Sequence, residues 1–393
     1  MLNYIALLIP LFLVLIALEW RYSLIQNDNR YKISNTAINM AIGAMDQVGA
    51  LAYLAVFYFA LNFSKTHFEI FHLPNDWRQW LLAAIVIDFV SYWYHRFSHR
   101  NHLLWAGHVT HHSSNHFNFS NGFRTSPFQG LFRIPFYLPL PMLGFDPLIL
   151  VVTFKVTGLW DFLVHTSYIN KLGPLETVFV TPSHHRVHHG KNECYIDKNY
   201  GSILIIWDKL FGTFQEEKET VVYGVKSDYQ DSNPVNAIFY HFRWLIKTCI
   251  TSTSWKNRLK IWFMPPEWTP TDTAAMSTTV LTPHKTLKKA RFYGYYLLST
   301  GTVGFIWVLF CYDTLQTDIA IYLFLLVVSQ IIQAAISLQE TQHPHFLYFE
   351  CLRWLSFALF GLMIFHPWPL IQICVFLLCC LSVILLSLSS SSP

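Results

Sequence analysis

The sequence has few charged residues. Asp, Glu, Lys and Arg make up 13% of its 393 residues, whereas an ordinary soluble domain carries about 25%. Hydrophobic residues account for 53% and aromatic residues for 17%. There is no long basic run, and the formal net charge is only +4, so nucleic acid is not an expected partner. This balance is typical of a membrane protein.

Cysteine is also scarce, and its distribution argues against a disulfide framework. The seven cysteines are an odd number without a C-x-x-C pair. Four of them fall in apolar runs: Cys311, Cys374, Cys379 and Cys380. We interpret them as small buried side chains in a reducing environment. The first apolar run has no basic segment before it, so it is interpreted as a retained helix rather than a cleaved export signal.

Long apolar runs predict an all-α integral membrane protein. A helix needs about 20 mostly apolar residues to cross the hydrocarbon core. Seven runs reach or approach this length: 2–19, 41–61, 80–94, 293–312, 318–337, 351–366 and 369–388. The apolar stretch 131–163 is interrupted by four prolines. We expect it to form a bent helical hairpin that enters the bilayer.

The alternation of apolar and polar segments predicts four parts. These are N-terminal transmembrane helices, a histidine-rich domain, a cytosolic connecting segment and a C-terminal transmembrane block, over residues 1–79, 80–215, 216–290 and 291–393. Lys and Arg gather in the polar segments after the first and third apolar runs and before the fourth. Because cytoplasmic loops are enriched in these residues, we expect the histidine-rich segments to face the cytosol.

Histidine is concentrated in one region of the chain. Twelve of the 19 histidines lie between residues 95 and 189. HRFSH places two histidines at i and i+4, and HVTHH and HRVHH each place three at i, i+3 and i+4. Residues at these spacings share one face of a helix. The pattern predicts metal ligation by His95, His99, His108, His111, His112, His185, His188 and His189.

A ninth candidate ligand, His165, lies between the two triplets in the sequence. Nine imidazoles exceed the roughly four to six ligands that one ion takes, so we expect two neighbouring metal ions. Imidazole suits zinc, copper, nickel and iron alike, and ligand type therefore leaves the metal open. The expected architecture is a transmembrane helix bundle with a cytosol-facing, histidine-rich cap that holds two metal ions.

Four further residues are candidates for supporting these ligands. Asp88 precedes His95 by seven residues, and Asp161 precedes His165 by four, so each pair shares a helix face. Asp208 follows the last triplet. We expect these carboxylates to accept hydrogen bonds from ligating imidazoles, which fixes the ring orientation. His184 is one step around the helix from its neighbouring triplet, which favours a supporting or substrate-side role.

The three histidine motifs resemble those of the membrane fatty acid hydroxylase and sterol desaturase superfamily, whose boxes are H-x-x-x-H, H-x-x-H-H and H-x-x-H-H. The matching residues are HRFSH, HVTHHSS and HHRVHHG. The longer stretch HTSYINKLGPLETVFVTPSHHRVHHGKNECYIDKNYGSILIIWDKLFGTF resembles the alkylglycerol monooxygenase branch. The similarity covers residues 80–215 strongly and the remainder only through its hydrophobic layout. Arg100 stands where the resemblance suggests an acidic residue, which argues against a carboxylate ligand there.

The resemblance implies a non-haem di-iron monooxygenase that uses O₂ to hydroxylate an unactivated lipid C–H bond. In the alkylglycerol branch the reacting carbon is ether-linked. The product is a hemiacetal that separates into a fatty aldehyde and glycerol, and tetrahydrobiopterin supplies the electrons. The resemblance also implies that the nine histidines bind two Fe ions and that the substrate enters from the bilayer. The membrane would be a bacterial plasma membrane or the endoplasmic reticulum.

Three other functions fit parts of the pattern. A fatty acid or sterol hydroxylase or desaturase would apply the same metal chemistry to a different lipid. A histidine-rich metal transporter would need ligands along a path through the membrane, whereas the triplets lie outside the apolar runs. A bis-histidine haem protein needs only two facing imidazoles, which leaves most of the histidines without a role.

Overall fold

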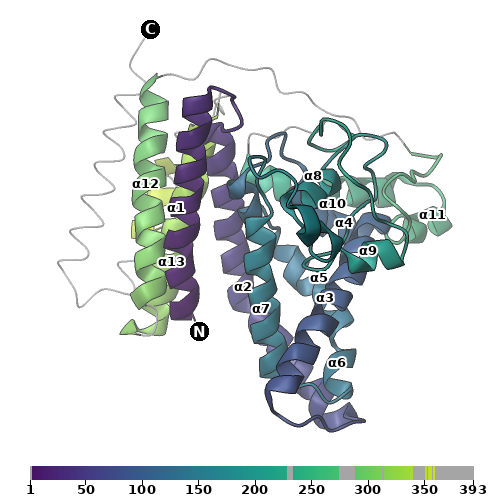
Figure 1. Cartoon of the computed structure of the whole chain (residues 1–393). Helices are drawn as coiled ribbons and strands as arrows, with labels where there is room; N and C mark the ends of the chain where they lie inside the picture. The colour runs from purple at the N-terminus through teal and green to yellow at the C-terminus, as the bar shows by residue number, and fades with distance from the viewer. Residues whose placement is uncertain are drawn as a thin grey trace. The chain divides into compact units, whose positions relative to one another are not determined.

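A computed structural model describes residues 2–227, 233–273, 288–311, 314–339, 350–351, 353–355 and 357–358, and this part of the chain is helical (Figure 1). Its α-helices are α1 (Leu2–Gln26), α2 (Ile33–Phe68), α3 (Trp77–Arg100), α4 (His102–His112), α5 (Pro127–Tyr137), α6 (Pro139–Met142), α7 (Pro147–Leu163), α8 (Pro182–His188), α9 (Ile206–Leu210), α10 (Pro234–Thr251), α11 (Trp255–Lys260), α12 (Lys288–Cys311) and α13 (Thr317–Ser337). Within the described ranges, extended pairing is limited to two isolated bridges. The predicted all-α fold is confirmed.

The chain divides into two compact units, and the first comprises residues 1–44, 232–234 and 280–393. In this unit α12 packs against both α1 and α13 (Figure 1). Three helices here are long and apolar enough to cross a membrane: Leu8–Gln26, Arg291–Cys311 and Thr317–Ser337. They correspond to three of the predicted runs and support an integral membrane protein. The predicted run 369–388, most of 351–366, and Cys374, Cys379 and Cys380 lie outside the described residues.

Two other predicted runs have different outcomes. The run 41–61 falls within α2, whose two segments, Ile33–Ala50 and Tyr53–Phe68, qualify as a fourth candidate span when taken together. The run 80–94 falls within α3, which is helical but is not among the candidate spans. Charged residues near both ends of α3 and Asp88 at its middle interrupt its apolar character.

The second unit comprises residues 45–231 and 235–279 and contains every histidine motif. Its central helix, α3, packs against α4, α5 and α7. The stretch predicted to form a bent hairpin is helical, and Pro139 and Pro147 begin α6 and α7, where a residue without an amide hydrogen is tolerated. Buried Leu61, Ile87 and Leu150 belong to the hydrophobic core beneath these helices. Entry of the hairpin into the bilayer stays a prediction, as do the domain boundaries at 79, 215 and 290.

The ends of three helices position the histidine motifs. The motif HRFSH occupies the last turns of α3, which stops at Asn101, an extended residue with φ −144° and ψ 122°. The side-chain oxygen of Asn101 then accepts a hydrogen bond from the amide of Leu104 at 3.1 Å and caps the start of α4. The motif HRVHH lies on α8, which begins with Pro182 after the capping residue Thr181. Helices α4, α8 and α9 gather at one end of α3 (Figure 1).

Candidate metal centre

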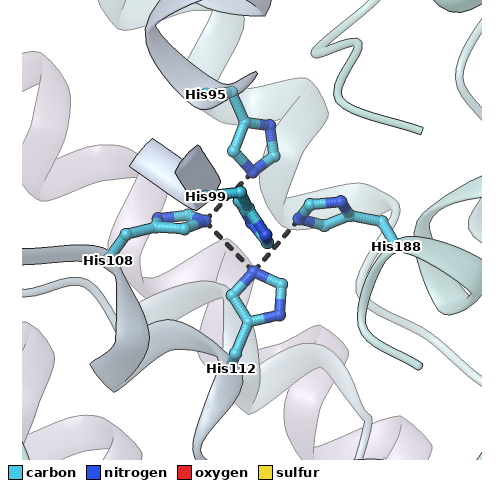
Figure 2. Close-up of side chains that lie close together, drawn as sticks. All are labelled: His95, His99, His108, His112 and His188. Atoms are coloured by element: carbon cyan, nitrogen blue, oxygen red, sulfur yellow. Dashed lines mark hydrogen bonds between the residues drawn. The ribbon is translucent and has the colours of Figure 1, made fainter. Parts of the chain in front are cut away.

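The structure brings all nine predicted histidines together in two groups. The first, which we call group one, contains His95, His99, His108, His112 and His188, and the second, group two, contains His111, His165, His185 and His189. Within each group, one nitrogen of every ring lies within 4.8 Å of one nitrogen of every other ring. In Figure 2 the rings of group one point toward a common centre, and they come from α3, α4 and α8. Either group could hold a metal ion.

The two histidine triplets are shared between the groups. From α4, His108 and His112 belong to group one and His111 to group two. At α8 the assignment is reversed, because His188 belongs to group one while His185 and His189 belong to group two. The rings of His112 and His189 stack with centroids 4.4 Å apart, so the two groups are adjacent. Each triplet therefore contributes to both groups rather than to a single centre.

The Nε2 atoms within each group are closely spaced. In group one, the Nε2 of His108 lies 3.0 Å from that of His95 and 3.1 Å from that of His112, which in turn lies 3.1 Å from that of His188. In group two, the corresponding distances from His165 are 3.3 Å to His111 and 3.0 Å to His185. Two nitrogens bound to one ion at about 2.1 Å and at right angles would lie about 3.0 Å apart. The spacing therefore fits ligands of a common ion.

Backbone carbonyls fix the orientation of four of the rings. The Nδ1 of His95 donates to the carbonyl of Tyr200 at 2.8 Å, and that of His188 donates to the carbonyl of Lys198 at 3.0 Å. The remaining two donations are from His111 to Arg124 at 3.3 Å and from His165 to Asp161 at 2.5 Å. A carbonyl only accepts hydrogen bonds, so Nδ1 carries the proton in each ring and Nε2 presents a lone pair. This is the tautomer that a metal ligand needs.

The chemistry of these donors fits a cation between them. His111 and His165 both hold their proton on Nδ1, so two Nε2 lone pairs face each other across 3.3 Å. Like-oriented lone pairs repel unless a positive centre lies between them. In group one, the Nε2 of His99 is buried without a hydrogen-bond partner among the described residues, and it lies amid the other four rings in Figure 2. A buried nitrogen of this kind calls for a ligand.

Burial favours the neutral form of seven of the nine imidazoles. It lowers the pKa of the seven members that lie outside α3, and for His165 the pKa falls to about 4; the seven are His108, His111, His112, His165, His185, His188 and His189. Desolvation disfavours the charged imidazolium, and for six of the seven the neighbouring histidines disfavour it further. Neutral imidazole is the form that binds metals.

Two of the predicted supporting acids act through a loop rather than directly on a ring. Asp208 accepts hydrogen bonds from the amides of Tyr200 and Gly201 at 2.7 and 2.8 Å. Asp88 accepts from the amides of Ile203 and Leu204 at 2.8 and 3.1 Å. Both carboxylates therefore hold the loop that presents the carbonyl of Tyr200 to the first histidine motif. The sequence alone suggested direct contacts with imidazoles, because it gave no sign that this loop lies between them.

The other two predicted supporting residues also have defined places. Asp161 offers its backbone carbonyl to His165, while its side chain accepts a hydrogen bond from Ser202 at 2.8 Å. His184 lies at the third position of α8, where its Nδ1 lies 3.2 Å from the carbonyl oxygen of Phe179 and 3.4 Å from the amide nitrogen of Thr181, the residue that caps α8. His184 thus fixes the start of the helix that carries the last triplet.

A carboxylate near His99 was not predicted. Arg100 donates a hydrogen bond to Asp197 at 2.6 Å, and the other oxygen of that carboxylate lies 3.7 Å from the Nδ1 of His99. Burial raises the pKa of Asp197, but His99 and Arg100 outweigh burial and lower it to about 2. Asp197 and Asn199 have positive φ angles of 58° and 54°. The turn-forming composition of IDKNYG was the available signal for this loop.

A cavity of about 90 Å³ adjoins both histidine groups. His95 and His108 of group one line it, as do His111, His165 and His185 of group two. The rest of its wall comes from α3, α5, α7 and neighbouring loops, and includes polar and aromatic side chains. A small molecule or a segment of a longer one could therefore reach both groups from the same space. The fold and the site together define a helical protein with candidate membrane spans and a nine-histidine centre.

Comparisons with known proteins agree with this class. The model of the family "Fatty acid hydroxylase" matches residues 80–213. The alkylglycerol monooxygenase of Homo sapiens is 35% identical over 271 residues, which cover 68% of this chain and 60% of that protein. The enzyme of the same name from Danio rerio is 37% identical over 264 residues, 66% of this chain and 59% of that protein.

A third relative carries a different activity in its name. Ornithine lipid hydroxylase OlsE of Rhizobium tropici is 34% identical over 145 residues, 36% of this chain and 44% of that protein. The chain therefore spans about 60% of the length of the alkylglycerol monooxygenases and less of the hydroxylase. No solved structure matches. Residues 80–213 thus match the fatty acid hydroxylase family model, and the chain is similar to alkylglycerol monooxygenases over about two thirds of its own length.

Proposed function

We propose that this protein is a membrane-bound di-iron monooxygenase that hydroxylates a lipid C–H bond, and that its substrate is an alkylglycerol hydroxylated at the ether-linked carbon. The observation that carries the proposal is the pair of adjacent histidine groups that line one cavity. The nine histidines that form the groups would hold two Fe ions. The similarity to alkylglycerol monooxygenases favours this substrate.

The reaction balances with one O₂, two electrons and two protons. One oxygen atom enters the C–H bond beside the ether oxygen, and the other leaves as water. The resulting hemiacetal separates into a fatty aldehyde and glycerol. Bound iron would supply O₂ activation and C–H cleavage, which side chains alone cannot perform. We propose tetrahydrobiopterin as the electron donor, as the resemblance of the histidine motifs to the alkylglycerol branch implies.

The protein's own residues would position the reactants. The carbonyls of Tyr200, Lys198, Arg124 and Asp161 hold four rings in one tautomer and one orientation. The cavity wall would exclude bulk water from the reacting carbon, which suppresses side reactions. Phe154 and Tyr94 in that wall offer apolar surface against which an alkyl chain can pack.

The substrate would come from the bilayer, and the histidine centre would face the cytosol. Arg21, Arg30 and Lys32 lie at and after the end of α1, and Arg96 and Arg100 lie beside the first histidine motif at the end of α3. If these segments are cytosolic, the positive-inside rule is satisfied on the side where the histidine groups lie. The membrane would be a bacterial plasma membrane or the endoplasmic reticulum.

The decisive experiment is aerobic turnover of a labelled alkylglycerol by iron-loaded membranes, with tetrahydrobiopterin present or withheld. Aldehyde release that depends on the pterin supports the proposal. The alternative is a fatty acid or sterol hydroxylase or desaturase of the same superfamily, and the similarity to ornithine lipid hydroxylase OlsE adds other membrane lipids to the candidates. Bound iron without aldehyde release would reject the ether substrate and favour that alternative. A histidine-rich metal transporter would instead move metal across vesicles without consuming O₂.

A further inference from the structure

The cavity beside the histidine groups contains two charged side chains that the histidine centre does not require. Arg133 on α5 and Asp161 on α7 both line it. Neither belongs to a histidine motif, and the side chain of neither contacts a histidine ring through a hydrogen bond given by the structure. A cation and an anion kept in the wall of a small internal space are expensive unless they have partners.

Arg133 has hydrogen-bonding capacity to spare. Its Nη2 donates to the side-chain oxygen of Gln129 at 3.2 Å, and the hydroxyl of Tyr94 is a second hydrogen-bond partner. The guanidinium carbon lies 5.1 Å from the ring centroid of Tyr94 and 5.2 Å from that of Phe154. A guanidinium carries five N–H donors, so most of them remain for a molecule in the cavity, while the two rings hold the group in place.

Asp161 offers the complementary chemistry. Its Oδ1 accepts a hydrogen bond from the hydroxyl of Ser202 at 2.8 Å. Within the described part of the chain, Ser202 is the one residue that donates to this carboxylate. A carboxylate can accept about four hydrogen bonds. Its backbone carbonyl meanwhile holds His165 of group two. The side chain that accepts hydrogen bonds in the cavity and the backbone carbonyl that orients His165 therefore belong to the same residue.

A donor-rich cation and an acceptor-rich anion in one cavity select a particular kind of ligand. An anionic headgroup would be repelled by Asp161 and a cationic one by Arg133, whereas an alkyl chain would leave the remaining hydrogen-bonding capacity of both side chains unused. A neutral polyol satisfies both, because each hydroxyl oxygen accepts from Arg133 while its hydrogen is donated to Asp161. We propose that Arg133 and Asp161 bind the free hydroxyls of a neutral glycerol-type headgroup and thereby set which carbon faces the histidine groups. This inference rests on the proposed function.

The first test needs no variant. The affinity of the purified, iron-loaded wild-type protein in lipid nanodiscs is measured for a radiolabelled alkylglycerol and for the same alkyl chain with both hydroxyls methylated. Loss of hydrogen bonds to charged groups should weaken binding of the methylated compound about 10- to 100-fold. Equal affinities for the two compounds would overturn the proposal. Because binding is read without turnover, this result is separate from whether the protein oxidises ethers.

Variants identify the residues. Arg133→Met and Asp161→Asn should each raise the Kd and the KM for the alkylglycerol about 10- to 100-fold and leave the Kd for the methylated compound unchanged. Arg133→Lys should restore part of the affinity, because it keeps the charge. The matched control is Arg78→Met, whose side chain is 72% exposed and pairs with Asp76; it should change nothing. Iron content and the thermal unfolding midpoint are measured in parallel.

These parallel measurements separate headgroup binding from a structural role. If Arg133→Met and Asp161→Asn weaken both compounds equally, or lose iron as they lose affinity, the headgroup assignment is wrong. If the wild-type protein prefers the free hydroxyls but releases no aldehyde, the proposed ether oxidation fails while the headgroup site stands. If Arg133→Met does not fold, Arg133→Lys and Asp161→Asn test the residues, and the wild-type comparison still decides whether the free hydroxyls are recognised.

Discussion

The carboxylate of Asp88 accepts a hydrogen bond from the indole Nε1 of Trp207 at 2.8 Å, although 119 residues separate them in the sequence. The amides of Ile203 and Leu204 donate to the same carboxylate. Asp88 lies at the middle of α3, and the three donors belong to the loop and helix that follow the last histidine motif. This one side chain therefore ties the loop behind the histidine centre to the helix that carries the first motif.

Replacing Asp88 should destabilise the protein. In Asp88→Ala, three partly buried donors lose their acceptor, and a hydrogen bond to a charged group contributes about 1.5–3 kcal/mol. The free energy of unfolding should therefore fall by several kcal/mol, with a smaller loss for Asp88→Asn, which keeps one acceptor oxygen. Thermal unfolding of detergent-solubilised protein checks this. The control is Asp76→Asn at the start of α3, which should be silent because Asp and Asn cap helices equally well; equal losses at both positions would contradict the assignment.

The histidine groups predict how single ligands affect bound metal. His188→Ala removes one of the five imidazoles of group one, so iron bound per chain should fall toward half and turnover should be abolished, while the protein still inserts into membranes. Iron analysis and activity of purified protein measure the two effects. His72→Ala is the matched control, since this histidine is exposed and belongs to neither group. Normal iron content and activity in His188→Ala would contradict the assignment of His188 as a ligand.

The spacing of the histidines carried most of the information about the site. It predicted which nine residues come together, and the structure brings all nine together. The division of each triplet between two groups is not encoded in that spacing. On a helix, positions i+3 and i+4 lie on either side of position i, and only the packing of α4 against α8 and α3 decides which group each side faces. The sequence therefore indicated a two-metal centre without its partition.

The supporting contacts were harder to predict. Four rings are oriented by backbone carbonyls, which every residue possesses, so no residue type marks them. The position of Asp197 could not be predicted, because only the fold of the loop after α8 brings its carboxylate near His99. The apolar run 80–94 correctly predicted a helix. It did not predict that Asp88, the buried acid on this helix, accepts hydrogen bonds from the loop behind the histidine centre. The local sequence pattern therefore predicted the helices, whereas the roles of Asp88 and Asp208 depend on tertiary contacts.

Close packing between α2 and α5 gives a third prediction. A Cβ added to Gly130 would lie 2.4 to 2.5 Å from three ring atoms of Tyr53, whereas one added to Gly158 on α7 would meet nothing within 4 Å. Gly130→Ala should therefore cost about 1–3 kcal/mol through overpacking, while Gly158→Ala should be neutral or stabilising by up to about 1 kcal/mol through helix propensity. Thermal unfolding of the two variants side by side measures the difference. Equal midpoints would show that Tyr53 moves aside without cost.

The orientation of the histidine centre can be tested with a native cysteine. Cys194 is exposed on the loop that follows the last histidine motif and lies six residues after His188. If this side faces the cytosol, a membrane-impermeant maleimide added to intact cells should not label Cys194, and labelling should appear after the membrane is permeabilised. Other free cysteines also react, so the signal is the difference from Cys194→Ser, which should keep its iron because Cys194 belongs to neither histidine group. Labelling of Cys194 in intact cells would place the histidine centre on the outer side and require that the lipid and the electron donor reach it from there.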